Sequence, residues 1–302
     1  SMKAGKPVYI EKPMAVTYEE CCRINRISQE TGIPCFVAYY RRYLPYFLKV
    51  KSLVEEGAIG NVINIQIRFA QPPRDLDYNK ENLPWRVQPD IAGGGYFYDL
   101  APHQIDILQD MFGYILEANG YKSNRGGLYP AEDTISACFK FDSGLPGSGS
   151  WCFVAHESAK EDRIEIIGDK GMICFSVFTY DPIALHTERG REEFLPENPP
   201  HVQLPLIKAV VEHLQGKAVC TCDGISATPT YGHPSIMPVL SVFPFRPRCI
   251  CTSGTEGLDS TGQQGCSHYI DRWNSDNCPS YRKKNQESGK RIQRGRYHLY
   301  LA

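Results

Sequence analysis

The sequence predicts an α+β fold, in which a short parallel strand–helix–strand unit precedes an open-faced, mainly antiparallel β-sheet with helices on one side. Residues 7–38 hold two short apolar runs separated by one helical segment, as in parallel strands joined by a crossover helix. Residues 63–69, 135–141 and 151–155 instead alternate apolar and polar side chains, which indicates strands with one buried and one wet face.

The N-terminal unit begins with an apolar strand at residues 7–10. Thr17 is expected to cap a helix that runs to residue 31 and ends at Gly32, and residues 33–38 form the second strand. Two strands and one helix cannot cover themselves. We therefore expect the chain to be a fragment of a longer one, or this half to be poorly formed.

The sheet follows a connector at residues 39–45, which contains Arg41 and Arg42, and a helix at 46–56. Residues 163–167 and 172–177 should form a hairpin around Gly168-Asp169-Lys170-Gly171, and 183–186 a further strand. The helix after residues 93–95 and another at 205–215 are predicted to cover one face of the sheet. The opposite face needs solvent or a second copy, so we predict a homo-oligomer formed through the open sheet face.

The composition excludes several classes of protein. With 302 residues, 42% hydrophobic and 22% charged, the chain has room for about two globular domains. A net charge of −1 gives no reason to expect nucleic acid as a partner. The sequence shows neither a membrane-length apolar run nor a signal peptide, which favours a cytoplasmic protein without a membrane partner. Reduced, buried thiols rather than disulfides are expected at four strand positions, which are Cys35, Cys138, Cys152 and Cys174.

Residues 230–302 differ in kind from the rest. They hold ten Lys and Arg against five Asp and Glu and show no helical or strand period, so we predict a disordered or non-native tail. Their potential metal ligands match no familiar zinc spacing, and we predict no metal site among Cys249, Cys251, Cys266, His268 and Cys278. The basic residues Lys283, Lys284, Lys290 and Arg291 are interpreted as a solvated tail rather than a nucleic-acid patch.

One helix carries candidate catalytic residues. Asp99 and His103 are four residues apart and share a helix face that Asp106 continues, and we expect this polar stripe to be exposed because the opposite face is apolar. An imidazole titrates near neutrality, and a nearby carboxylate can fix its tautomer, as general acid–base catalysis requires. The alternative is that Asp99 only caps the helix and His103 is solvated.

Three motifs together resemble a known family. Glu11-Lys12-Pro13 after a strand, Gly93-Gly94-Gly95-x3-Asp99-x3-His103, and Ile166-Ile167-Gly168-Asp169-Lys170-Gly171 occur in the order and at the separations of the Gfo/Idh/MocA oxidoreductases, the glucose-fructose oxidoreductase and inositol dehydrogenase group. The resemblance covers residues 5–229. It implies that residues 1–38 are the C-terminal remnant of a Rossmann-type dinucleotide-binding domain, followed by a substrate and dimerisation domain at 39–229.

The resemblance also implies an activity, which is hydride transfer between NAD or NADP and a secondary alcohol or carbonyl of a sugar or polyol-like substrate. Glu11, Lys12 and Pro13 would lie at the cofactor, and Lys12 would stabilise negative charge on the substrate oxygen. His103 would remove the hydroxyl proton, and Asp99 would orient His103 or a neighbouring hydroxyl. Trp85 and Arg86 are predicted to line the substrate pocket, with an ordinary surface pair as the alternative.

One departure from the family bears on the cofactor. The sequence contains no Gly-x-Gly-x-x-Gly turn and no acidic ribose partner, so it lacks the backbone amides that would bind a pyrophosphate. We therefore expect this chain alone to be deficient in cofactor binding. The competing hypothesis is a truncated, non-catalytic domain that dimerises through its sheet. The substrate and the choice between NAD and NADP are not determined by these motifs.

Overall fold

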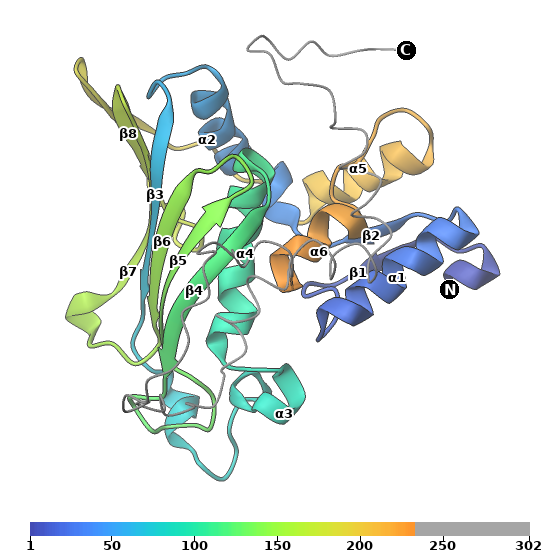
Figure 1. Cartoon of the computed structure of the whole chain (residues 1–302), viewed down its shortest axis with the longest axis horizontal. Coiled ribbons are helices and arrows are strands. Elements are labelled where there is room, and N and C mark those ends of the chain that lie inside the picture. Colours follow the sequence, from blue (N-terminus) through green and yellow to red (C-terminus); the bar gives the residue numbers. More distant parts are fainter. Residues whose placement is uncertain (233–302) are drawn as a thin grey trace, which may run out of the picture. The chain divides into compact units, whose positions relative to one another are not determined.

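The computed structural model describes residues 1–232 (Figure 1). The predictions for the tail beyond residue 232, including its disorder and its metal and basic clusters, fall outside the described residues. The helices are α1 (Tyr18–Thr31), α2 (Pro45–Glu55), α3 (Pro89–Ala92), α4 (Tyr96–Phe112), α5 (Leu204–Leu214) and α6 (Gly224–Gly232), with short 3-10 helices η1 (Met2–Ala4), η2 (Tyr40–Tyr43), η3 (Asp75–Tyr78), η4 (Trp85–Val87) and η5 (Glu157–Ala159). In this part of the chain, none of the helices combines the length and the apolar character needed to cross a membrane.

The predicted strand–helix–strand unit is present. Strands β1 (Val8–Ile10) and β2 (Cys35–Val37) pair in parallel, and α1 connects them. Thr17 caps α1 as expected: its Oγ1 accepts from the Glu20 amide, and the Glu20 carboxylate accepts from the Thr17 amide, both at 3.2 Å. Gly32 ends the helix with φ 67°, the left-handed conformation that glycine adopts most readily.

The second sheet is the large, mainly antiparallel one that the alternating runs predict. Its order is β10-β9-β8-β7-β3-β6-β5-β4, and only the central β3–β6 pair is parallel. The strands are β3 (Val62–Ala70), β4 (Ile115–Ser123), β5 (Thr134–Phe141), β6 (Pro146–Cys152), β7 (Glu161–Gly168), β8 (Gly171–Phe175), β9 (Ile183–Thr187) and β10 (Gly190–Phe194). The sequence did not reveal β4 and β10. Both are edge strands with few buried side chains, so neither shows a clear alternation.

Helix α4 runs along one face of this sheet (Figure 1). The indole of Trp151 lies edge-on to Phe97 with ring centroids 5.0 Å apart, and its Nε1 donates to Gln104 Oε1 at 2.7 Å. Residues 101–109 of α4 are all buried. A helix that is buried on every side must lie between two packed layers.

Helix α5 does not cover the sheet, contrary to the prediction. Its Leu206 and Val210 pack in a second core with Cys35 and Phe36 of β2, and α6 joins the same core through Ala227. The apolar period of a helix shows that one side is buried, but it does not show against which sheet. Residues 204–232 therefore return to pack on the N-terminal unit.

The eight cysteines among the described residues are free thiols. Cys35 is buried as expected, and burial raises its pKa to about 11. Cys138 is exposed, so its predicted burial is wrong. Its side chain alternates onto the open face of β5, whereas the neighbouring Phe139 lies in the core.

The β7–β8 hairpin requires glycine at its first turn position. A Cβ atom at Gly168 would lie 2.1 Å from the backbone oxygen of Ile59, which has no flexible end to move aside. We expect Gly168→Ala to lower the free energy of unfolding by about 1–3 kcal/mol, as overpacking does. Urea titration measures this, and Lys170→Ala in the same hairpin, where the side chain is exposed, is the control expected within about 0.5 kcal/mol of the wild type. Equal effects of the two changes would contradict the steric explanation.

Candidate active site

Lys12 reaches from the carboxyl end of β1 to the first turns of α4. Its Nζ donates to Asp99 Oδ1 at 2.7 Å and to the Asp99 backbone oxygen at 2.8 Å, with both side chains about four-fifths buried or more. The other carboxylate oxygen, Oδ2, accepts from Arg86 Nε at 3.0 Å. One carboxylate therefore holds two cations, and the pair of motifs predicted to act together is brought together in space.

Asp99 is not a helix cap. The N-cap of α4 is Gly95, four residues earlier, and the Asp99 carboxylate accepts hydrogen bonds from Lys12 and Arg86 instead. Asp99 was expected to orient His103 or a neighbouring hydroxyl, but its carboxylate contacts Lys12 and Arg86. The cap is a glycine because a Cβ there would lie 2.6 Å from the Glu132 backbone oxygen.

His103 lies one turn after Asp99 and is 5% exposed, so the solvated alternative is wrong. Aromatic rings surround the imidazole, with centroids 6.4, 6.0 and 6.0 Å away for Tyr39, Tyr40 and Phe178. The Nδ1 atom is buried and has no hydrogen-bond partner among the described residues. Buried polar atoms are rarely left without a partner, so this atom is a candidate for contact with a ligand.

The charge state of His103 follows from these surroundings. Burial lowers its pKa well below 6.5, and the positive charges of Arg41 and Lys12 lower it further. The imidazole is therefore neutral near pH 7. A neutral imidazole can accept a proton, as a general base must.

In the sequence Arg41 is only part of a connector, whereas in the structure it lies beside His103. Its Nη1 donates to the Tyr40 hydroxyl at 2.9 Å and its Nε to the backbone oxygen of Val177 at 3.2 Å. The guanidinium lies 4.9 Å from the ring centroids of both Tyr40 and Phe178. The sequence could have indicated this position, because Arg41 follows β2 as Lys12 follows β1. The carboxyl ends of parallel strands meet at one edge of a sheet, so the two side chains are expected near each other.

The segment that carries Phe178 is fixed by Asp162. Its Oδ2 accepts from the backbone amides of residues 177, 178 and 179 at 2.9, 2.5 and 3.1 Å. Burial raises the pKa of Asp162, while these hydrogen bonds and Arg41 oppose that shift. Neither the carboxylate nor the segment was evident from the sequence, because the contact joins β7 to the connection after β8.

The remaining predicted residues are divided. Arg86 reaches Asp99, whereas Trp85 is 53% exposed and lies under the Arg86 guanidinium at 4.6 Å. Glu11 turns the other way, and its Oε1 accepts from Gln203 Nε2 at 3.1 Å just before α5. The structure thus gathers Lys12, Arg86, Asp99 and His103 and leaves Glu11 and Trp85 at the margin.

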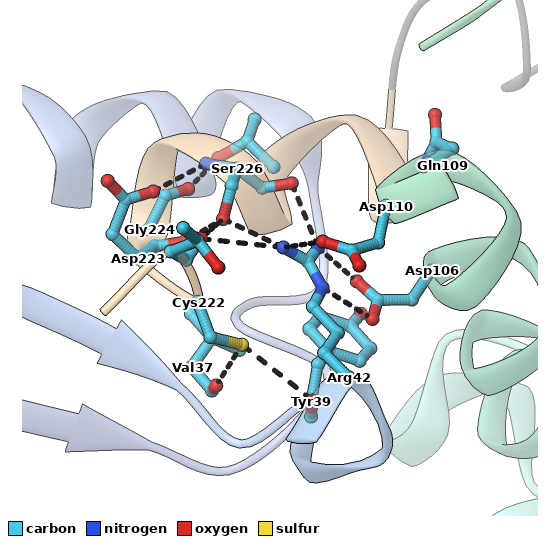
Figure 2. A network of polar contacts seen from close by, with 12 residues as sticks. Val37, Tyr39, Arg42, Asp106, Gln109, Asp110, Cys222, Asp223, Gly224 and Ser226 are labelled. Atoms are coloured by element: carbon cyan, nitrogen blue, oxygen red, sulfur yellow. Dashed lines mark hydrogen bonds and ion pairs between the residues drawn. The ribbon is translucent and has the colours of Figure 1, made fainter. Parts of the chain in front are cut away.

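Asp106 also departs from the predicted exposed polar stripe. It is 1% exposed and accepts two hydrogen bonds from Arg42, at 2.8 Å from Nε and 2.5 Å from Nη2 (Figure 2). The stripe is buried because η2 and α6 cover this face of α4. Within residues 1–232, no cluster of three or more His, Cys, Asp or Glu side chains is arranged to hold a metal ion.

Comparison with known proteins agrees with this architecture. Residues 47–174 match the family model described as the GFO/IDH/MocA C-terminal domain. Oxidoreductase P35 of Formosa agariphila is 36% identical over 213 residues, which are 70% of this chain and 64% of that protein. Levoglucosan dehydrogenase of Pseudarthrobacter phenanthrenivorans is 29% identical over 58% of this chain and 50% of its own length. The chain thus spans between half and two thirds of these curated relatives.

Among solved structures, an oxidoreductase from Agrobacterium radiobacter in complex with NAD+, L-tartaric acid and magnesium superposes with a TM-score of 0.64. The match covers 76% of this chain and 69% of that one at 17% identity. At this identity the likeness shows a shared fold.

The buried, neutral His103 predicts a pH dependence of stability. Its pKa in the folded state lies below the ordinary 6.5, so between pH 7 and 5 the unfolded chain takes up a proton that the folded chain does not. His103 should therefore lower the free energy of unfolding as the pH falls, by up to about 1.4 kcal/mol per pH unit. Denaturant titrations at several pH values should show this slope in the wild type and a smaller one in His103→Gln. His201→Gln, which changes an exposed histidine, should run parallel to the wild type. Parallel curves for all three proteins would contradict the burial argument.

Proposed function

The chain belongs to the GFO/IDH/MocA family through residues 47–174, and on that premise we propose that it carries the catalytic site of an NAD(P)-dependent oxidoreductase. The reaction is the oxidation or reduction of a secondary alcohol or carbonyl on a sugar or polyol-like substrate. One observation supports this most: a neutral, buried His103 with an unpartnered Nδ1 lies one helical turn from the Lys12–Asp99–Arg86 cluster.

Each residue of the cluster has a role in this proposal. A bound nicotinamide dinucleotide supplies the hydride acceptor. A ring nitrogen of His103 accepts the hydroxyl proton of the substrate, and the Lys12 ammonium stabilises the negative charge that develops on that oxygen. Asp99 holds Lys12 in place, since the Lys12 ammonium is fixed by two hydrogen bonds to this one residue. The rings around His103 keep water from competing for the proton.

The residues present fit the nicotinamide end of such a cofactor. The unpartnered Nδ1 of His103 and the Lys12 ammonium lie at the carboxyl edge of the parallel β1–β2 pair, where open α/β sheets bind their ligands. Glu11, Lys12 and Pro13 would border it, and residues 1–38 would be the remnant of the dinucleotide-binding domain. The sequence contains no Gly-x-Gly-x-x-Gly motif for the pyrophosphate, and the choice between NAD and NADP stays open.

The competing hypothesis of a non-catalytic domain is tested most directly by cofactor binding. NADH and NADPH are titrated into the chain alone, and their fluorescence is followed. The titration is repeated with the chain fused behind the dinucleotide-binding half of a relative. We expect enhancement in the fusion. No enhancement in either protein would favour the non-catalytic hypothesis.

Turnover by the fusion tests the role of His103. His103→Ala should lower turnover by roughly a hundred- to ten-thousand-fold, the usual effect of removing a positioned general base, while NAD(P)H binding changes little. Steady-state rates on a panel of sugars and polyols measure this. In the wild type, the plot of kcat/KM against pH should have the midpoint of its acidic limb below pH 6.5, because the pKa of His103 is lowered. Turnover near the wild-type rate in His103→Ala would overturn the assignment.

Lys12 and Asp99 should respond differently from His103. Lys12→Ala is expected to weaken both cofactor binding and turnover, because Lys12 would stand between substrate and nicotinamide. Asp99→Asn keeps the shape but leaves Lys12 and Arg86 without their shared anion, so we expect turnover to fall by roughly tenfold or more. Lys208→Ala, an exposed change on α5, is the control. If Asp99→Asn matched this control, the carboxylate would have no role in the site.

The open face of the large sheet supports an assembly proposal. It forms a trough of about 680 Å³ whose lining includes Tyr121, Ser148 and Arg163. Tyr121 is 87% exposed, and the face carries charges of both signs, among them the Arg68–Glu161 pair at 2.7 Å. A surface with both signs can face its own copy without net repulsion. We propose that two copies of the chain pair through this face.

Sedimentation measures this association. The wild type should be dimeric at micromolar concentration, and Ser148→Arg, which adds a bulky cation to the exposed floor of the trough, should weaken association at least about tenfold. Lys208→Glu on the exposed side of α5 should leave it unchanged. A monomeric wild type, or a Ser148→Arg variant that associates normally, would contradict the proposed face.

A further inference from the structure

Two ion pairs hold the same face of α4, and His103 lies between them. Asp99, His103 and Asp106 follow at i, i+4 and i+7, so the two aspartates are about 10 Å apart along the axis. Lys12, from the turn after β1, binds the first aspartate, and Arg42, from the turn after β2, binds the second. Each pair thus links α4 to the carboxyl end of a strand of the parallel sheet.

The Arg42 guanidinium is fixed on every side (Figure 2). Its Nε and Nη2 form a fork on the two carboxylate oxygens of Asp106. Its Nη1 donates to the Ser226 hydroxyl at 3.1 Å and to the Thr221 backbone oxygen at 3.5 Å, and Nη2 also donates to the Ser226 backbone oxygen at 3.3 Å. Asp110 lies 3.8 Å from Nη1, one turn further along α4. A single side chain therefore joins η2, α4 and the start of α6.

The burial of this pair indicates what it contributes. The side chains of Arg42 and Asp106 are 4% and 1% exposed. Burial alone would lower the pKa of Arg42, but Asp106 raises it well above its ordinary value, so the pair is charged. Removing two charges from water offsets most of their attraction, and apolar side chains of similar volume often stabilise a fold equally well. What an apolar pair cannot reproduce is the directional fork, which fixes both distance and rotation.

We propose that Arg42 and Asp106 are positioning residues that set α4 against the ends of β1 and β2 and thereby hold His103 in register with Lys12. Neither residue touches the reacting groups. The inference rests on the proposed function in one respect, since it gives His103 and Lys12 a joint role. The geometry it predicts is measurable in the 302-residue chain without any turnover.

The test compares Lys12–Asp99 coupling in two backgrounds. Unfolding constants are measured for Lys12→Met, Asp99→Asn and the double change, first in the wild type and then in Arg42→Met/Asp106→Leu. In the wild type, the constants should show a coupling of roughly five- to thirty-fold. In the second background, the chain should stay folded while the coupling falls to less than about twofold. Unchanged coupling would overturn the proposal.

A second variant and a spectroscopic measurement cover the case in which the apolar background does not fold. Arg42→Lys keeps the charge and loses the fork, so it should also reduce the coupling by at least half. In this variant, the NMR titration of His103 should show a pKa nearer 6.5 than in the wild type, because the imidazole is less closely enclosed. Lys51→Met, which removes the α2–α4 ion pair at Asp110, should change neither measurement.

The two measurements separate the possible outcomes. If Arg42→Lys leaves both the coupling and the His103 titration unchanged, the pair is structural only and the proposal fails. If the coupling is lost as expected while His103→Ala retains turnover, the positioning stands and the proposed catalytic role of His103 fails instead.

Discussion

The burial of the central residues of α4 is the constraint on which the rest of the site depends. Its residues 101–109 lie between the large sheet and the N-terminal unit, so polar groups on it have no access to bulk water. Such groups require partners inside the protein. Gln104 meets Trp151 on the sheet side, whereas Asp106 meets Arg42 on the other. Two buried atoms of this stretch, His103 Nδ1 and Gln104 Nε2, have no hydrogen-bond partner among the described residues.

The partners of α4 come from two strand ends because parallel strands carry their following residues to one edge. Lys12 follows β1, and η2 follows β2. Within η2, successive side chains diverge: Arg41 turns toward the segment that carries Phe178, and Arg42 turns toward α4 and α6. The aromatic rings around His103 and the Arg42–Asp106 ion pair therefore both depend on η2.

Helix α6, the last described element, packs against both α1 and Arg42. Asn25 of α1 donates to the Gly224 backbone oxygen at 3.1 Å and to Thr228 Oγ1 at 2.7 Å, which holds α6 against α1. Ser226 of the same helix accepts from Arg42. A segment that follows the large sheet in sequence thus completes the core of the unit that precedes it. Such an arrangement gives the N-terminal strands cover that residues 1–38 lack by themselves.

The sequence by itself determined the periods and the local signals. Alternation along β3 and β5 predicted a sheet with one open face, and Thr17 predicted the start of α1. The motifs that contain Lys12, Asp99 and His103, together with the motif that ends at Gly171, indicated the family. These signals act over a few residues, so they can be read along the chain. Only the tertiary structure decided which groups that are far apart along the chain contact one another. The edge strands β4 and β10 lack a period, α5 packs on the smaller sheet, and Asp106 is buried rather than exposed. The last two depend on what covers a surface, and partners 64 or more residues away supply that cover.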